Sequence, residues 1–262
     1  MIRGIDHLVI ACEDPDAAAE ELASGLGIIS TGGGRHEAFG TRNRIAWLAD
    51  GSYLELIGIE DPERASTSPV GAAAMRALEG GGGLATWAAL VDDVGAAAQE
   101  LDAAGASWGL PAHGTRRRDD GELVEWWTAF PSRPLEPAVP FLIQHALTGA
   151  EWGSEAREER SHFMHALGSP VLLSRLDLAA SDPPSSAASL HGLLGLDVWA
   201  VADLAVADIG PHVVRLVPRR EMAVPAVVTL GADVDTPLTA DLLGLRFDVE
   251  RVALPVTSAP SA

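Results

Sequence analysis

Two polar residues, His7 and Glu55, interrupt strand-like runs that are otherwise apolar. Alternation along a β-strand places His7 on one face with Val9, and Glu55 on one face with Tyr53 and Ile57. Burying a carboxylate is costly unless it is paired or coordinated, so Glu55 needs a partner. His7 and Glu55 could simply hydrogen-bond to each other or reach solvent, but the motif around both favours a functional position.

An internal repeat predicts the elements that carry these residues. The pattern D-x-x-A-A-A-x-E-L begins at Asp14 and again at Asp93, 79 residues later. In each copy the Asp suits a helix N-cap, and the Ala-rich run that follows favours a helix. Apolar runs around both helices predict strands. The expected strands are 5–12, 44–48 and 53–59 in the first copy, and 84–91, 123–130 and 139–146 in the second.

The repeat therefore predicts an α+β fold with two βαβββ modules, at about residues 1–62 and 83–148. A weaker third copy begins at Asp182 and closes with Leu194-Gly195-Leu196, as the first helix closes with Leu26-Gly27-Ile28. We expect residues 149–169 to be a connector. Residues 170–262 then hold a divergent βαβββ module and a truncated βαβ fragment whose helix lies at 238–243.

Three motifs resemble the glyoxalase-like branch of the vicinal oxygen chelate superfamily, which includes bleomycin-resistance proteins and dioxygenases. They are Ile5-Asp6-His7-Leu8-Val9-Ile10, Gly40-Thr41-Arg42-Asn43-Arg44 and Asp50-Gly51-Ser52-Tyr53-Leu54-Glu55-Leu56-Ile57. The resemblance covers about residues 1–148. It implies that the paired modules curl into a barrel-like cup that holds a small molecule and often a divalent metal. It implies a fold more firmly than an activity, because the superfamily hosts several chemistries.

The resemblance also implies that His7 and Glu55 are metal ligands, but the second module departs from the family pattern. The 79-residue spacing aligns His7 with Thr86, which is a poor ligand for a transition metal. By motif, Glu55 aligns with Gln144, whose carbonyl oxygen can coordinate. His145 would serve only after a one-residue shift, which turns a side chain to the opposite face. The predicted site is therefore one Fe, Mn, Ni, Co or Zn ion on His7, Glu55 and Gln144.

Other residues are candidates for binding the substrate. The Gly-rich segment 32–37 contains His36, is expected to be a flexible loop, and lies near Arg42 and Asn43. Tyr53 shares a strand face with Glu55, and Thr86 occupies the position equivalent to His7. These five residues are the predicted substrate contacts. In the third copy Arg175 and Arg215 stand at the positions of His7 and Glu55, where they indicate a scaffold, a lid or an anion site instead of a metal site.

Composition excludes several classes of partner. With 18 Lys and Arg against 37 Asp and Glu, the formal net charge of -19 would repel nucleic acid and anionic membranes. The basic run Arg116-Arg117-Arg118, followed by Asp119-Asp120-Gly121, indicates a solvated hairpin loop. One cysteine and no apolar run of membrane-spanning length predict a cytoplasmic protein. Exposed strand edges make a homodimer plausible.

Two functions follow, with a third kept open. The leading hypothesis is a metal-assisted lyase, isomerase or oxygenase acting on a substrate with adjacent oxygens, in which Glu55 moves a proton. The alternative is a metal-free binding protein of the bleomycin-resistance type, which sequesters a compound in a Trp-lined cup. The third is an interaction protein that binds through its Arg-bearing C-terminal region.

Overall fold

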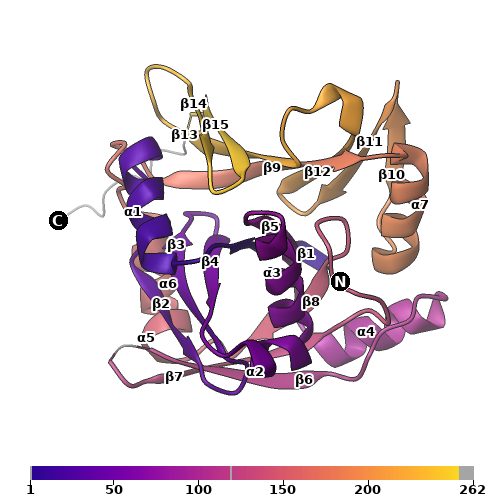
Figure 1. The fold of residues 1–262 in the computed structure, drawn as a ribbon, viewed down its shortest axis with the longest axis horizontal. Helices are drawn as coiled ribbons and strands as arrows, with labels where there is room; N and C mark the ends of the chain where they lie inside the picture. The colour runs from indigo at the N-terminus through magenta and orange to yellow at the C-terminus, as the bar shows by residue number, and fades with distance from the viewer. Residues whose placement is uncertain (1, 119, 254–262) are drawn as a thin grey trace.

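The computed structural model describes residues 2–118 and 120–253 and contains two sheets stacked one above the other (Figure 1). The lower sheet is a closed eight-stranded barrel in the order β1-β4-β3-β2-β6-β7-β8-β5. The upper sheet is open and has seven strands, in the order β10-β11-β12-β9-β13-β15-β14. The predictions of an α+β fold and of paired, cup-forming modules are confirmed. The final residues, 254–262, and Asp119 of the predicted hairpin lie outside the described residues.

The first module is βαβββ, followed by two helices. Its helix begins after Asp14, whose side chain accepts hydrogen bonds from the backbone N–H groups of Asp16 and Ala17, and it ends at Gly27, which has a left-handed φ of 68°. The elements are β1 (Ile2–Ala11), α1 (Pro15–Leu26), β2 (Gly32–His36), β3 (Thr41–Trp47), β4 (Tyr53–Ile59), α2 (Pro62–Thr67) and α3 (Pro69–Glu79).

The second module repeats this arrangement. Asp93 caps its helix through the N–H of Ala96, as the repeat predicted. The elements are β5 (Gly83–Val91), α4 (Val94–Ala103), β6 (Ala112–Arg117), β7 (Leu123–Ala129) and β8 (Phe141–His145).

Two segments that were expected to be loops are strands. In β2 a Cβ atom on Gly33 or Gly34 would collide with the backbone of β3 or β6, so these glycines allow the close packing by which β2 and β6 close the barrel. The glycine content alone indicated a loop, because it does not show that β2 packs against the distant strand β6. In β6, Arg116 is buried and the turn begins only at Arg118. The prediction of a solvated Arg116 is wrong.

Strand register corrects the alignment of the second module. Val9 pairs with Glu55 in the parallel ladder of β1 and β4, and Ala88, 79 residues after Val9, pairs with Phe141 in the parallel ladder of β5 and β8. Phe141 is therefore the structural counterpart of Glu55, and Gln144 is not. The short motif misaligned them because β8 is more distant from its repeat start than β4 is.

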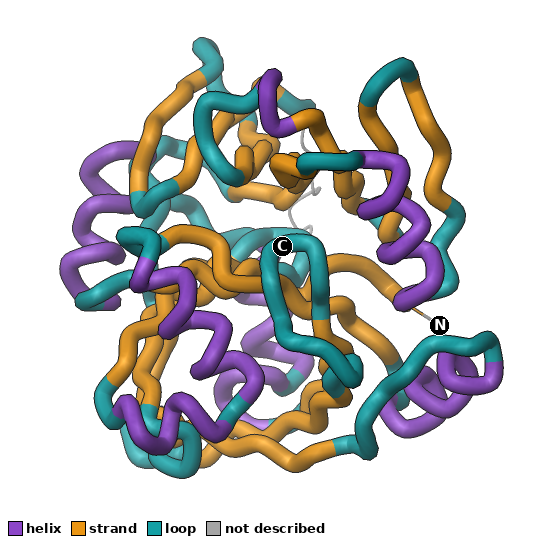
Figure 2. The backbone as a smooth tube through the Cα atoms, turned by 45° about the vertical axis from the view of Figure 1, so that its right-hand side comes forward, coloured by secondary structure: helices purple, strands orange, loops and turns teal. Residues whose placement is uncertain are grey.

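The upper sheet repeats the barrel's strand order. Helices α5 (Gly149–Trp152) and α6 (Ser154–Ser161) connect the barrel to it. Its elements are β9 (Val171–Ala180), α7 (Pro183–Leu194), β10 (Val198–Val201), β11 (Leu204–Ile209), β12 (His212–Pro218), β13 (Ala226–Ala232), β14 (Leu238–Leu242) and β15 (Leu245–Arg251). Within the described residues no strand takes the place that β6 has in the barrel, so this sheet stays open (Figure 2).

The predicted helix at 238–243 is wrong, because β14 pairs with β15 in an antiparallel hairpin. Leu243 and Gly244 form the two-residue turn and both have positive φ, 53° and 71°. A segment of this length is too short to form a stable helix unless it packs as one, whereas the hairpin pairs it with a neighbouring strand.

One hydrophobic core joins the two sheets. His212 at the start of β12 links them, because its Nδ1 accepts a hydrogen bond from the Ile5 backbone N–H at 2.9 Å and its Nε2 lies 3.3 Å from Asp50 Oδ2. The upper sheet therefore contacts the barrel at β1, the strand that carries the candidate residue His7. Among the described residues, no helix is long and apolar enough to cross a membrane.

Candidate functional site

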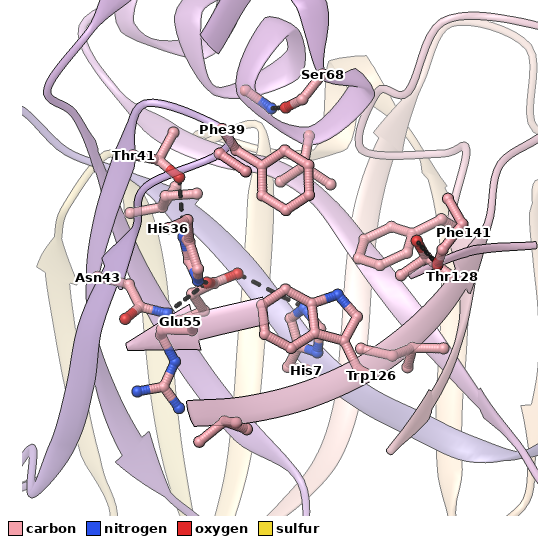
Figure 3. Close-up of a pocket in the computed structure, with 18 of the residues that line it drawn as sticks. His7, His36, Phe39, Thr41, Asn43, Glu55, Ser68, Trp126, Thr128 and Phe141 are labelled. Atoms are coloured by element: carbon pink, nitrogen blue, oxygen red, sulfur yellow. Dashed lines mark hydrogen bonds and ion pairs between the residues drawn. The ribbon is translucent and has the colours of Figure 1, made fainter. Parts of the chain in front are cut away.

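The barrel encloses a cavity of about 370 Å³ (Figure 3). Its wall is mixed: aromatic and aliphatic side chains make up most of it, and a smaller group of ionisable and amide side chains lies among them. The apolar lining includes Phe39, Ile45, Tyr53, Ile57, Val124, Trp126, Phe130, Phe141, Ile143 and Trp152, and the polar lining includes His7, His36, Thr41, Asn43, Glu55, Arg116, Thr128, His145 and Glu151. Such a pocket suits a small, mostly apolar ligand with a few polar groups.

Glu55 lies at the centre of the polar group. The Asn43 side-chain amide donates to its Oε1 at 2.6 Å. Two imidazoles also approach its carboxylate: His7 Nε2 lies 3.6 Å from Oε2, and His36 Nε2 lies 3.9 Å from Oε1. Alternate residues of β3 and β4 point into the barrel, which is why Asn43 and Glu55 face the same space (Figure 3). These residues were predicted from the sequence to share a ligand-binding cup, and the structure brings them together.

Asp6 connects His7 to a second histidine. Its Oδ1 lies 2.6 Å from His7 Nδ1, and both of its oxygens lie 3.0 Å from His145 Nε2. Regular alternation would turn Asp6 away from His7, but the β1–β5 ladder shifts register between Ile5 and His7. A shift of this kind turns consecutive side chains toward the same region. Sequence reasoning missed Asp6 because nothing in the strand pattern marks the irregularity.

The charge state of Asp6 follows from these contacts. Burial would raise the pKa of its carboxyl, but the facing His145 and His7 outweigh burial and hold that pKa below its usual range. Asp6 is therefore an anion, and an anion can only accept hydrogen bonds. Asp6 accepts the hydrogen of His7 Nδ1, so Nε2 is the nitrogen of His7 that faces Glu55.

His36 and Tyr53 are buried cavity residues. Burial is the main cause that lowers the pKa of His36 to about 4, with Glu55 opposing and Arg116 adding to the effect. His36 is therefore neutral near pH 7, and its Nδ1 lies 2.8 Å from Thr41 Oγ1. Burial raises the pKa of Tyr53 well above its ordinary value. Its ring stacks on His7, with the centroids 4.5 Å apart, and so holds that imidazole in place.

The connector supplies another part of the wall. Trp152 of α5 stacks on His145 with the ring centroids 3.6 Å apart. Glu151 is buried beside it and forms ion pairs with Arg116 and Arg118. The guanidinium of Arg160 in α6 lies 3.9 Å from the centroid of the Trp47 ring. This segment was predicted only as a connector, and no motif in it indicated that it would complete the cavity.

Three predicted site residues do not lie in the cavity. Arg42 points outward from β3 and forms ion pairs with Asp14 and Asp16 at the start of α1. Thr86 is fully buried, and its hydroxyl donates to the Val139 carbonyl at 2.9 Å. Gln144 turns away from the barrel interior, where its carbonyl oxygen accepts from the Val94 N–H at 3.0 Å. The predictions that Arg42 and Thr86 bind substrate and that Gln144 binds metal are corrected accordingly.

These positions decide whether the donor set fits a divalent metal. Gln144 points away from the cavity. In the second module the counterpart of His7 is Thr86, whose hydroxyl is hydrogen-bonded to a backbone carbonyl, and the counterpart of Glu55 is Phe141. Within 2–118 and 120–253 no group of three or more His, Cys, Asp and Glu side chains is arranged to hold a metal ion. The residues present therefore do not fit the metal that the resemblance implies.

Comparison with known proteins places the chain in a family. A family model described as a glyoxalase-like domain matches residues 5–194. The chain belongs to this glyoxalase-like family. The vicinal oxygen chelate resemblance is confirmed, and the match extends into the third module. A search of curated proteins found no match.

Solved structures support the same fold for this glyoxalase-like protein. A hypothetical protein from Staphylococcus aureus is 14% identical, with a TM-score of 0.77 over 95% of this chain and 99% of that one. A mutant of 4-hydroxymandelate synthase from Streptomyces coelicolor is 15% identical, with a TM-score of 0.52 over 89% and 72%. Methylmalonyl-CoA epimerase from Streptomyces coelicolor is 25% identical, with a TM-score of 0.41 over 56% and 99%. The first two likenesses concern the fold and not the activity, and the third, with its lower TM-score, supports no conclusion.

Proposed function

We propose that the barrel cavity is the active site of an isomerase or lyase that moves a proton on a small, mostly apolar carbonyl compound. The observation that carries this proposal is the position of Glu55, a buried carboxylate at the cavity wall with two imidazoles within 4 Å. Clusters of buried ionisable groups in a cavity are typical of catalytic sites. Neither a structural core nor a simple solvated surface needs such a cluster.

In the proposed reaction Glu55 is the general base. Its carboxylate takes the proton from a carbon next to the carbonyl, and the electron pair of that C–H bond moves onto the carbonyl oxygen. His7 Nε2 then receives the proton from Glu55 and returns it to the substrate at another atom. The imidazolium formed at His7 is stabilised by the Asp6 carboxylate, whose Oδ1 lies 2.6 Å from Nδ1.

The proposal needs no step through a metal, since the donor set does not fit one. It retains the lyase and isomerase parts of the sequence-based hypothesis and does not carry the oxygenase part forward. The substrate must fit the aromatic lining, so aryl ketones and aryl aldehydes are suitable test compounds.

Deuterium exchange tests the proposal directly. The protein is incubated in D2O with EDTA and acetophenone, 4-hydroxyacetophenone or phenylacetaldehyde, and loss of the proton next to the carbonyl is followed by NMR. We expect exchange above the buffer rate, and a decrease of about 10²- to 10⁴-fold in Glu55→Gln, which cannot accept the proton. The matched control is Arg215→Gln, at the equivalent position of the upper sheet, which should exchange as the wild type does. Equal rates in wild type and Glu55→Gln, or no exchange with any compound, would overturn the proposal.

A second candidate function is binding without chemistry, and the apolar half of the cavity favours it. Where the first module has Glu55, the second has Phe141, and Phe130, Ile143 and Trp126 extend the same wall. A sequestering protein would show a rise in melting temperature with an aromatic ligand in EDTA, by mass action on the folded state. It would show that rise equally in Glu55→Gln, with no deuterium exchange in either protein.

A further inference from the structure

The upper sheet ends at β10, an apolar edge strand. In the order of this sheet β10 has β11 on one side and no strand among the described residues on the other (Figure 1). Its sequence, Val-Trp-Ala-Val, contains no ionisable residue and no proline. Trp199 is 43% exposed and Val201 is 50% exposed. An exposed apolar edge of this kind offers its backbone N–H and C=O groups to another strand.

The opposite edge of the same sheet, β14, is protected. Pro237 directly precedes this strand, and Asp241 within it forms an ion pair with Arg246 of β15. Proline and charged side chains are common means by which edge strands avoid pairing with other chains. The contrast indicates that β10, and not β14, is the edge that another strand covers.

A groove beside β10 continues this apolar surface. It has a volume of about 480 Å³ and is lined by β10, β11 and one side of helix α7. The helix contributes Pro184, Ala187, Ala188 and His191, whose i, i+3, i+4 and i+7 spacing puts them on one helix face. The small alanine side chains leave room for side chains of a partner. A strand paired with β10 would therefore extend the sheet and also bring covering residues to this groove.

The hairpin of β10 and β11 fixes how a second strand can pair. A two-residue turn joins Val201 to Leu204, which lie opposite each other and so form a hydrogen-bonded pair. The direction of the backbone groups alternates along a strand, so Trp199 also directs its N–H and C=O toward β11. Val198 and Ala200 direct theirs outward. The outward donors and acceptors are therefore placed symmetrically on either side of Trp199.

We propose that β10 pairs antiparallel with β10 of a second copy of this chain, with Trp199 opposite Trp199 of the partner subunit. A two-fold axis perpendicular to the sheet at this position puts Val198 opposite Ala200 in both directions, so the outward N–H and C=O groups bond to each other. The two Trp199 side chains then form a non-hydrogen-bonded pair, in which side chains are closest and aromatic pairs stabilise the sheet.

Two further observations favour a second copy as the partner. In the barrel, the counterpart of β10 is β2, and that edge is already covered by an antiparallel strand, β6. The net charge of -19 makes copies of the chain repel each other in general, and β10 is a segment without ionisable residues at which they can approach. The inference does not depend on the proposed reaction, because β10 does not line the barrel cavity.

Sedimentation equilibrium tests the inference with a proline that blocks only the outer side of the strand. Ala200→Pro removes an N–H that points away from β11, so the ladder with β11 stays intact. We expect the wild type to show a monomer–dimer equilibrium between roughly 1 and 200 µM, and Ala200→Pro to dimerise at least about 10-fold more weakly, because each copy loses a hydrogen bond. The matched control is Thr239→Pro, at an outward position of the other edge strand β14, which should dimerise as the wild type does. Circular dichroism confirms that both variants are folded.

Disulfide cross-linking tests the register and does not depend on the proline variant. The Cα atoms of a non-hydrogen-bonded antiparallel pair lie about 4.5 Å apart, within reach of a disulfide, so Trp199→Cys should give a covalent dimer on mild oxidation. Val201→Cys should not, because in this register it lies four residues along the ladder from its copy, roughly 13 Å away. The single native cysteine, Cys12, is buried, so it should contribute little background.

Several outcomes would overturn the inference. They are a wild-type monomer at every concentration, a dimer that folded Ala200→Pro leaves unchanged, and a dimer that is lost in Thr239→Pro. Absence of cross-linking in Trp199→Cys, or cross-linking in Val201→Cys instead, would overturn it as well.

Discussion

The barrel and the upper sheet have the same strand order, yet they present different chemistry at equivalent positions. In the barrel, His7 and Glu55 face a cavity. In the upper sheet the parallel ladder of β9 and β12 pairs Asp177 with Arg215 as the ladder of β1 and β4 pairs Val9 with Glu55. There, Asp177 accepts hydrogen bonds from both Arg175 and Arg215, so both guanidinium groups are paired within the sheet.

Closure accounts for the difference. The contact of β2 with β6 encloses the inner face of the barrel, so its polar groups are shielded from water and their interactions are strong. The upper sheet lacks an equivalent of β6 among the described residues, and Arg175 and Arg215 are about a quarter to a third exposed. The comparison indicates that the repeated module supplies the scaffold and that a few side chains on an enclosed face supply the function.

Each sheet has one aspartate that accepts from two cationic or imidazole side chains, Asp6 in the barrel and Asp177 in the upper sheet. Substituting each of them tests whether closure of the barrel explains the difference between the sheets. Asp6→Asn replaces the carboxylate shared by His7 and His145 inside the closed barrel with a neutral amide, which has one acceptor oxygen in place of two. We expect the free energy of unfolding to fall by about 3–5 kcal/mol, because a fully buried pair is broken. Deuterium exchange should also fall by about 10- to 100-fold, because His7 loses the group that fixes its proton. Chemical denaturation and NMR measure the two effects.

Retention of full stability in Asp6→Asn would contradict this account, as would normal exchange. Asp241→Asn is the control, because that carboxylate is exposed on β14 of the upper sheet, outside the cavity lining, and its loss should change neither quantity.

The sequence predicted the scaffold better than the site, and particular residues show why. The D-x-x-A-A-A-x-E-L repeat located both barrel modules because caps and apolar alternation are local signals. His7, His36, Asn43, Tyr53 and Glu55 were correctly placed together, since they share inward positions on three neighbouring strands and β1.

The failures depend on contacts between distant segments. Asp6 faces His7 only because the ladder with β5 shifts, and Arg116 is buried only because Glu151, from the connector, lies beside it. Gln144 and His145 differ by one position in β8, and register alone decides which of them faces the cavity. Composition and residue spacing do not reveal such contacts between distant segments.

The enclosed face of the barrel also predicts a pH effect on stability that the open sheet should not share. Burial lowers the pKa of His36 from 6.5 to about 4. Between these values the unfolded chain binds a proton that the folded chain does not, so the free energy of unfolding falls as pH is lowered. From pH 7 to pH 5 we expect His36 to contribute a loss of about 2 kcal/mol. Urea denaturation at both pH values measures it.

His36→Gln isolates this contribution, because Gln can hydrogen-bond to Thr41 without titrating in this range. The pH dependence of the variant should be weaker than that of the wild type by about the same amount. Parallel curves for the two proteins would show that His36 is not the group responsible, and would weaken the claim that closure shields the inner face.

The smallest expected effect is at the open sheet and completes the comparison. Asp177→Asn leaves Arg175 and Arg215 without their shared carboxylate, but both can turn toward water because they are partly exposed. We expect a loss of only about 1 kcal/mol in the free energy of unfolding, after allowing for solvent screening, and no change in deuterium exchange. Denaturation and exchange are measured beside Asp6→Asn. If Asp177→Asn cost as much as Asp6→Asn, closure would not explain the difference between the two sheets. If it abolished exchange, the upper sheet would have to contribute to the site.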